Sequence, residues 1–86
     1  MTSARFSGEV QGAINRLNAG GRLYVIEERP YPYPHTVVVV LDKERYSISF
    51  NDFAFMSMQN IIQPTGSTIF EGFPAEEYVI SPNFEA

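Results

Sequence analysis

The chain has 86 residues, of which 44% are hydrophobic and 14% aromatic, and it contains no cysteine. This length supports one hydrophobic core, and the apolar content is too high for a disordered chain, so we expect a single domain over 1–86 with flexible ends at 1–6 and 81–86. The lack of cysteine excludes disulfides and thiolate metal sites. The longest apolar run, Val37–Leu41, is too short to span a bilayer, and we expect a cytoplasmic location.

The formal net charge of −4 is unevenly distributed along the sequence. All six basic residues lie in the first 45 positions, which leaves that part at about +1 and the remainder at about −5. Because non-specific nucleic-acid binding needs clustered cations, we expect no direct contact with nucleic acid. The acidic C-terminal half fits a basic protein partner better. Its candidate contact residues are Glu71, Glu76 and Glu77.

A first helix is predicted to begin at Gly8, with Ser7 as its N-cap and Glu9 in the favourable first turn. The adjacent glycines Gly20 and Gly21 predict its end. Four apolar residues at the i, i+3, i+4, i+7 spacing form one face, which we expect to pack on a sheet: Val10, Ala13, Ile14 and Leu17.

Three strands are predicted to follow the first helix. Leu23–Ile26 is rich in β-formers, and Thr36–Leu41 carries four consecutive valines. Because its residues are apolar on both faces, Thr36–Leu41 is predicted to be a central, fully buried strand. The polar residues 42–45 are typical of a hairpin connection, and the alternation in Tyr46–Phe50 predicts a half-buried strand.

The remainder of the sequence predicts a second helix and two short strands. We favour a largely buried helix over Phe53–Gln63, capped by Asn51-Asp52, although alternating phenylalanines also allow a strand. Short strands are expected at 68–70 and 78–80, joined through residues 72–77. The predicted fold class is therefore α+β, with two helices on a mostly antiparallel sheet of four to five strands in the order α-β-β-β-α-β-β.

Few residues in this sequence are typical of catalysis or metal binding. The single histidine, His35, lies in a proline-rich loop, so a site with two histidine ligands is excluded within one chain. No serine lies in a Gly-x-Ser-x-Gly motif, and the adjacent pair Glu76-Glu77 in a strand would point to opposite faces, as solvated edges. We therefore expect no enzymatic activity, no metal site and no cofactor.

The most unusual segment is the loop from Arg29 to His35, where prolines alternate with Tyr31 and Tyr33. Prolines at every second position remove backbone donors and keep the segment extended. Tyrosines offer large contact areas at a small entropic cost, so either they pack on their own sheet or they contact a partner. We predict interaction residues in this loop, namely Arg29, Tyr31, Tyr33 and His35, and we expect a homodimer or higher oligomer.

Three functions fit these observations. The first is a non-enzymatic protein-binding domain, because interaction surface is plentiful and catalytic groups are scarce. The second is an inhibitor of the kind that phages and mobile elements encode, whose acids would occupy a basic groove of a nucleic-acid enzyme. The third is a small-molecule binder with a pocket between sheet and helices, into which Arg22, Tyr24 or Tyr46 would point.

Overall fold

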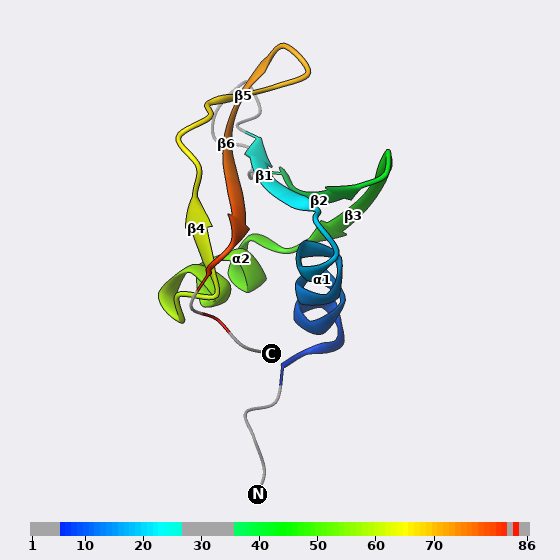
Figure 1. Cartoon of the computed structure of the whole chain (residues 1–86), viewed down its shortest axis with the longest axis vertical. Coiled ribbons are helices and arrows are strands. Elements are labelled where there is room, and N and C mark those ends of the chain that lie inside the picture. The colour runs from blue at the N-terminus through cyan, green and yellow to red at the C-terminus, as the bar shows by residue number, and fades with distance from the viewer. Residues whose placement is uncertain (1–5, 27–35, 83, 85–86) are drawn as a thin grey trace, which may run out of the picture.

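Two helices and six antiparallel strands make up the computed structural model, which describes residues 6–26, 36–82 and 84 (Figure 1). The elements follow in the order α1 (Gly8–Asn18), β1 (Arg22–Ile26), β2 (Thr36–Leu41), β3 (Glu44–Ile48), α2 (Phe50–Met58), β4 (Ile62–Pro64), β5 (Ile69–Phe70) and β6 (Phe73–Ile80). The predicted α+β class and the order α-β-β-β-α-β-β are confirmed, with β4 as an additional short strand.

Helix α1 forms as its sequence predicts. The Ser7 hydroxyl accepts a hydrogen bond from the Val10 N–H at 3.1 Å, and the predicted apolar face is buried. The chain then turns into β1 through Gly21, whose N–H donates to the Arg16 carbonyl at 2.9 Å. A side chain at Gly21 would meet two backbone carbonyl oxygens, those of Arg16 at 2.8 Å and Val40 at 3.0 Å. Only glycine therefore fits this close approach between helix and sheet.

The sheet has the strand order β3-β2-β1-β6-β4, with β5 paired to β6. Strand β2 lies between β1 and β3, and Val37, Val38 and Val39 are all buried. The prediction of an interior valine strand is confirmed. Full burial does not extend to Val40 and Leu41, which are half-buried because they approach the exposed end of the hairpin.

The hairpin between β2 and β3 is tighter than the sequence indicated. Asp42 and Lys43 alone form the turn, with φ of 51° and 72°, and β3 begins at Glu44. Two successive residues with positive φ are typical of the type I′ turn, whose twist matches that of the flanking strands. The expected polar connection over 42–45 and strand over 46–50 are therefore wrong in range, since β3 ends at Ile48 and Phe50 starts α2.

Helix α2 has the favoured conformation but begins and ends earlier than expected. Ser49 is its N-cap and accepts a hydrogen bond from the Asp52 N–H at 3.0 Å, so the helix covers Phe50–Met58. It is also less buried than expected, because Phe55 and Met58 are exposed. The chain leaves the helix before Ile62, which enters β4.

Strands β4, β5 and β6 form a long hairpin that rises away from the helices (Figure 1). Its turn consists of Glu71 and Gly72, with φ of 51° and 84°, so residues 73–77 belong to β6 and not to a connection. The predicted linker over 72–77 is wrong for this reason. The segment between β4 and β5 also bonds to β6, through three backbone hydrogen bonds: Thr65 N–H to Glu77 O, Glu77 N–H to Ser67 O, and Ala75 N–H to Thr68 O.

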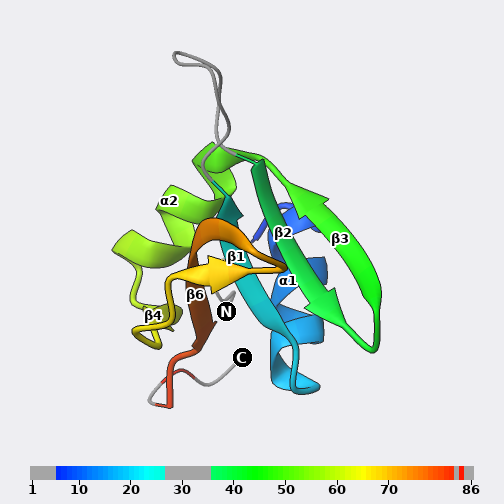
Figure 2. The same ribbon diagram turned by 90° about the horizontal axis from the view of Figure 1, so that it is seen from above.

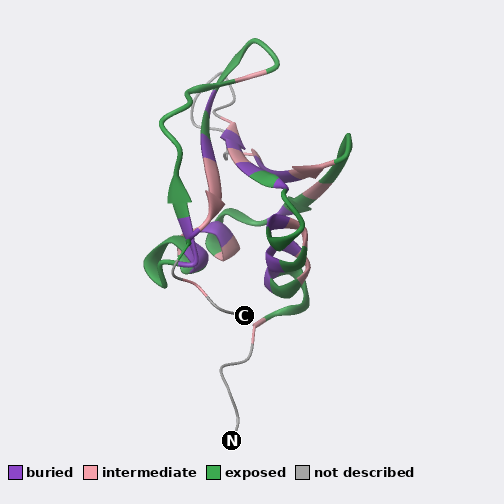
Figure 3. Ribbon diagram, viewed as in Figure 1, coloured by how far each residue is buried: buried purple, intermediate pink, exposed green. Residues whose placement is uncertain are grey.

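The two faces of the sheet are covered differently. Both helices lie on one face, where the buried side chains concentrate, while the β5–β6 hairpin crosses the opposite face (Figures 2 and 3). The helix face holds the core residues Ile14, Leu23 and Met56, and the rings of Phe6 and Phe84 pack against this core from the two ends of the chain. On the helix face, the space between the start of α2 and β6 is only partly filled, and we call this place the rim.

Candidate functional site

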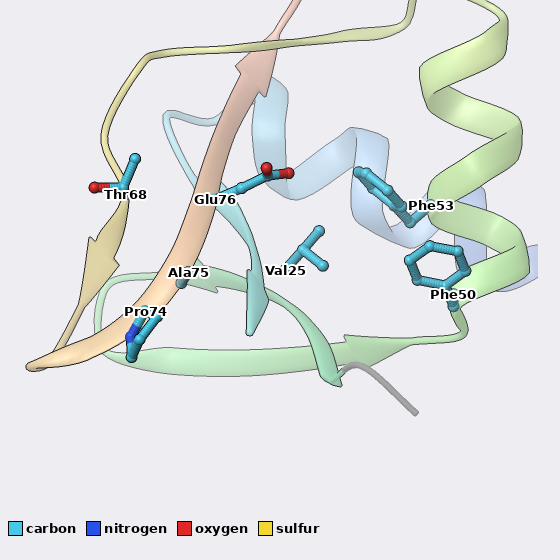
Figure 4. A pocket seen from close by; sticks show the side chains of 7 residues that line it. All are labelled: Val25, Phe50, Phe53, Thr68, Pro74, Ala75 and Glu76. Carbon is cyan, nitrogen blue, oxygen red and sulfur yellow. The ribbon is translucent and has the colours of Figure 1, made fainter. Parts of the chain in front are cut away.

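An open groove of about 370 Å³ lies along this rim, between the start of α2 and the upper part of β6 (Figure 4). Its lining residues come from β1, α2, β6 and the segment before β5: Val25, Phe50, Phe53, Thr68, Pro74, Ala75 and Glu76. Most of these side chains are apolar, and Glu76 is the one charged side chain among these lining residues. The groove is therefore an apolar surface with a carboxylate at its edge.

Aromatic rings form the helix side of the groove. Because Ser49 caps α2, Phe50 and Phe53 lie three residues apart on one helix face, with ring centroids 5.4 Å apart and planes at 51°. Phe53 also meets the ring of Tyr78 edge-on, at 5.1 Å and 67°. Phe53 is buried, whereas Phe50 is 44% exposed. The wall thus combines a fixed ring with an accessible one.

Glu76 is held at the strand side of the groove by its neighbour two residues along β6. The Tyr78 hydroxyl donates a hydrogen bond to Glu76 Oε1 at 2.9 Å. Burial, followed by this bond, raises the pKa of Tyr78 to about 12, so the phenol remains a donor at neutral pH. Pairing of Glu76 with Val25 places the carboxylate over the groove, directed across it toward Phe53 (Figure 4).

Glu77 points to the other side of β6 and is only 9% exposed. Its carboxylate accepts three hydrogen bonds: from the Thr65 hydroxyl at 2.6 Å, the Tyr24 hydroxyl at 2.7 Å and the Arg22 guanidinium at 3.1 Å. Since these donors come from β1 and from the residue after β4, Glu77 joins three segments of the sheet. The interpretation of Glu76-Glu77 as solvated edges is wrong for Glu77.

The charge state of this network follows from its hydrogen bonds. The Thr65 hydroxyl, and then Tyr24 and Arg22, lower the pKa of Glu77 and outweigh the opposing effect of burial. Burial, followed by the hydrogen bond to Glu77, raises the pKa of Tyr24 to about 12. At neutral pH, Glu77 is therefore an anion and Tyr24 a neutral donor, and the cluster connects β1, β6 and the residue after β4.

A second ion pair fastens the tip of the long hairpin to β3. The Arg45 guanidinium contacts the Glu71 carboxylate at 2.6 Å and lies 5.3 Å from the centroid of Phe70. The Phe70 ring stacks on Tyr24 with centroids 4.2 Å apart. The uneven charge along the sequence is thus partly balanced in space, because basic residues of the first half meet acids of the second.

The structure distributes the predicted interaction residues over three places. Glu71 lies at the hairpin tip, Glu76 lines the groove, and Glu77 is buried and bonded to Thr65, Tyr24 and Arg22. The predicted loop residues lie outside the described part of the chain, and their role stays a prediction: Arg29, Tyr31, Tyr33 and His35. Ile26 and Thr36, which border that segment, are paired across β1 and β2.

The residues proposed for a pocket between sheet and helices do not line the groove. Tyr24 and Arg22 contact Glu77 on the face opposite the helices. Tyr46 packs under α1, with the Arg16 guanidinium 3.9 Å from its ring centroid. Sequence reasoning missed the aromatic wall, Phe50 and Phe53, because it placed these residues in a strand and at a helix start.

Comparison with protein-family models, with curated proteins and with solved structures finds no match to this chain. Within the described ranges, no three His, Cys, Asp or Glu side chains come together as a metal site. Neither described helix has the length and apolar character needed to cross a membrane. The function therefore has to be inferred from the groove itself.

Proposed function

We propose that this chain is a non-enzymatic protein-binding domain that holds a basic side chain of its partner in the groove between α2 and β6. The observation that carries the proposal is the juxtaposition of an exposed carboxylate, Glu76, with the rings of Phe50 and Phe53 along one apolar groove. An arginine or lysine side chain has a matching structure, since its aliphatic stem packs on apolar surface while its cationic head meets a carboxylate or a ring face.

The electrostatics of the three candidate acids support the choice of Glu76. Glu71 and Glu77 are already in ion pairs with Arg45 and Arg22. In the described part of the chain, Glu76 accepts a hydrogen bond from Tyr78 but forms no ion pair. An incoming cation at Glu76 therefore gains a charge interaction without displacing an existing one.

The inhibitor alternative needs several free carboxylates on one face to fill a basic groove. Ion pairing of Glu71 and Glu77 gives that model no specific support, and we do not adopt it. A small cationic ligand would use the same chemistry as a basic side chain. We favour the protein because the groove is open along one side and gives access to a side chain attached to a larger body.

The proposal is tested by NMR titration of the folded chain with N-acetyl-arginine amide and with its neutral isostere, N-acetyl-citrulline amide. We expect saturable shifts in the amides of Phe50, Phe53 and Glu76, with the arginine probe binding about ten-fold more tightly, because one hydrogen bond to a charged group contributes about 1.5 kcal/mol. Glu76→Gln should remove this preference.

Glu44→Gln is the matched control, since Glu44 is an exposed acid on β3 that does not line the groove. This variant should retain the preference for arginine. Equal binding of the two probes, or a preference that survives Glu76→Gln, would refute the proposed function.

A further inference from the structure

A second open cavity, of about 500 Å³, lies at the other end of α2 from the Glu76 groove, and we call it the α2–β4 cavity. Its volume is in the range of sites for small molecules. Its lining residues come from the end of α2, from β4 and from the segment after β6: Gln59, Asn60, Ile62, Gln63, Ser81 and Phe84. Three of these six residues carry a side-chain amide, one carries a hydroxyl, and none carries a charge.

The end of α2 forms one side of this cavity. Asn60 has a φ of 59°, and its N–H donates to the Ser57 carbonyl at 3.1 Å. The Ile61 N–H donates to the Met56 carbonyl at 2.9 Å, and the two bonds together make a Schellman motif that ends the helix. Glycine is the usual residue at this position, because it adopts a positive φ without strain. Asparagine in its place adds an amide to the cavity lining.

The pairing of β4 with β6 brings the other side of the cavity into place. Ile62 lies opposite Ile80, and the Ser81 N–H extends this pairing by donating to the Ile61 carbonyl at 2.8 Å. The Phe84 N–H then donates to the Ser81 carbonyl at 3.1 Å, so the chain turns between these two residues. Phe84 is half-buried and lines the cavity beside Ser81. The α2–β4 cavity therefore combines amides, a hydroxyl and an aromatic ring.

The polar side chains of the cavity are free of hydrogen bonds to the described part of the protein. Ser81 is only 9% exposed, yet no residue in the described ranges bonds to its hydroxyl. Every polar side-chain atom that is sealed from solvent in those ranges has a partner, so the Ser81 oxygen opens into the cavity that it lines. The amides of Gln59, Asn60 and Gln63 are equally available. A nearly buried hydroxyl directed into a polar cavity indicates a ligand that bonds to it.

We propose that the α2–β4 cavity binds a neutral sugar residue. Each sugar hydroxyl is both a donor and an acceptor, and each side-chain amide offers a donor and an acceptor on neighbouring atoms, so the amides match pairs of adjacent hydroxyls. The Ser81 hydroxyl supplies one further bond of the same kind. The C–H face of a sugar ring is apolar and packs on an aromatic ring, which Phe84 provides.

The lining of the cavity disfavours other classes of ligand. A charged ligand would lose hydration without gaining a countercharge, because none of the six lining residues is ionisable. An apolar ligand would leave the amides and the hydroxyl without partners. The donors and acceptors of a nucleoside base lie in one plane, whereas these amides come from the helix end and from β4, which favours hydroxyls arranged around a ring. The site is separate from the Glu76 groove and does not depend on it.

NMR titration of the folded chain with the methyl glycosides of glucose, galactose and N-acetylglucosamine tests the site. We expect saturable shifts in the backbone amides of Gln59, Asn60 and Ser81 with at least one of these probes at millimolar concentration. Asn60→Gly should weaken binding about two- to ten-fold, because it removes a hydrogen-bonding amide while glycine keeps the conformation that ends α2. Ser81→Ala should weaken binding similarly without lowering the free energy of unfolding, since its hydroxyl has no partner in the described chain.

Asn18→Ala is the matched control, because Asn18 is the last residue of α1 and does not line the cavity, and this variant should bind like the wild type. Asn60→Gly should still bind N-acetyl-arginine amide in the Glu76 groove, which distinguishes a failure of the sugar site from a failure of the proposed function. Three outcomes would overturn the proposal: no saturable shift with any of the three glycosides, glycoside binding that either cavity substitution leaves unchanged, or shifts in this cavity with adenosine or cytidine and with no glycoside.

Discussion

Replacing Glu77 by glutamine tests whether its network holds the long hairpin on the sheet. The carboxylate accepts three hydrogen bonds, of which those from Thr65 and Tyr24 are short at 2.6 and 2.7 Å. An amide is neutral and has one acceptor oxygen, so at least one of these part-buried hydrogen bonds to a charged acceptor is lost, at about 1.5–3 kcal/mol. Arg22 is 53% exposed and adds little, because solvent screens its charge. We expect a loss of about 2 kcal/mol.

That loss corresponds to a melting temperature lower by about 8–16 °C for a domain of this size. Urea denaturation followed by circular dichroism measures the free energy of unfolding, and Glu76→Gln is the control because the neighbouring carboxylate is exposed. The control should change stability by less than about 0.5 kcal/mol. If the two variants are equally stable, the network does not hold the hairpin and our assignment of Glu77 is wrong.

The free energy of unfolding of Glu77→Gln should also differ from that of the wild type in its dependence on pH. The pKa of Glu77 in the folded state lies below its ordinary value of 4.5, so the folded chain binds this proton less readily than the unfolded chain. The stabilisation is therefore present above about pH 4.5 and is lost as the pH falls through the folded pKa. Glu77→Gln should remove this component of the acid sensitivity, which a purely steric defect would leave unchanged.

Two further predictions concern the packing of α1 and the half-buried, hydrogen-bonded tyrosines Tyr24 and Tyr78. Gly21→Ala should destabilise the fold by about 1–3 kcal/mol in the same urea assay, because its methyl group would collide with two backbone carbonyls, whereas Gly8→Ala, which meets open space, should not. The pKa values of Tyr24 and Tyr78 are raised from 10 to about 12. Their contribution to the free energy of unfolding should therefore be fully present below pH 10 and should be lost as the pH rises toward 12. A double Tyr→Phe variant that keeps the full alkaline loss would contradict this assignment.

Sequence patterns correctly predicted the helix and the strand whose defining residues all lie within one short segment. The stripe from Val10 to Leu17 fixed the buried face of α1, and Ser7 fixed its start. The run of valines in β2 predicted an interior strand, because only strands with neighbours on both sides tolerate apolar residues at every position. These features needed no knowledge of distant contacts.

The errors arose where two local signals competed. Ser49 and Asn51-Asp52 are all acceptable N-caps, and the apolar residues Ile61 and Ile62 extend the helical pattern beyond the real end of α2. Burial of Ile62 in β4 requires pairing with Ile80, eighteen positions away in sequence. Similarly, Glu71-Gly72 between two phenylalanines is the turn of a hairpin, but glutamate is a weak turn residue and the signal was not decisive.

The groove lay beyond sequence reasoning for a related reason. Its two walls come from α2 and β6, and they face each other only because β1 pairs with both β2 and β6. No spacing along the chain encodes that adjacency. The acidic residues themselves were recognised, yet their partners were not, since the contacts of Glu77 with Arg22 and Tyr24 span more than fifty residues.

One local rule nevertheless explains how β6 serves both the fold and the groove. Adjacent residues in a strand point to opposite faces, so the neighbouring carboxylates Glu76 and Glu77 have different surroundings. Glu77 turns to the side where β1 and Thr65 supply three donors, and it becomes buried and anionic. Glu76 turns to the aromatic wall and stays exposed. A shift of one residue in the pairing of β6 with β1 that brought Tyr78 to the place of Glu77 would leave the three donors without a carboxylate acceptor. The requirement to pair Glu77 therefore also fixes the position of the carboxylate that we propose meets the partner.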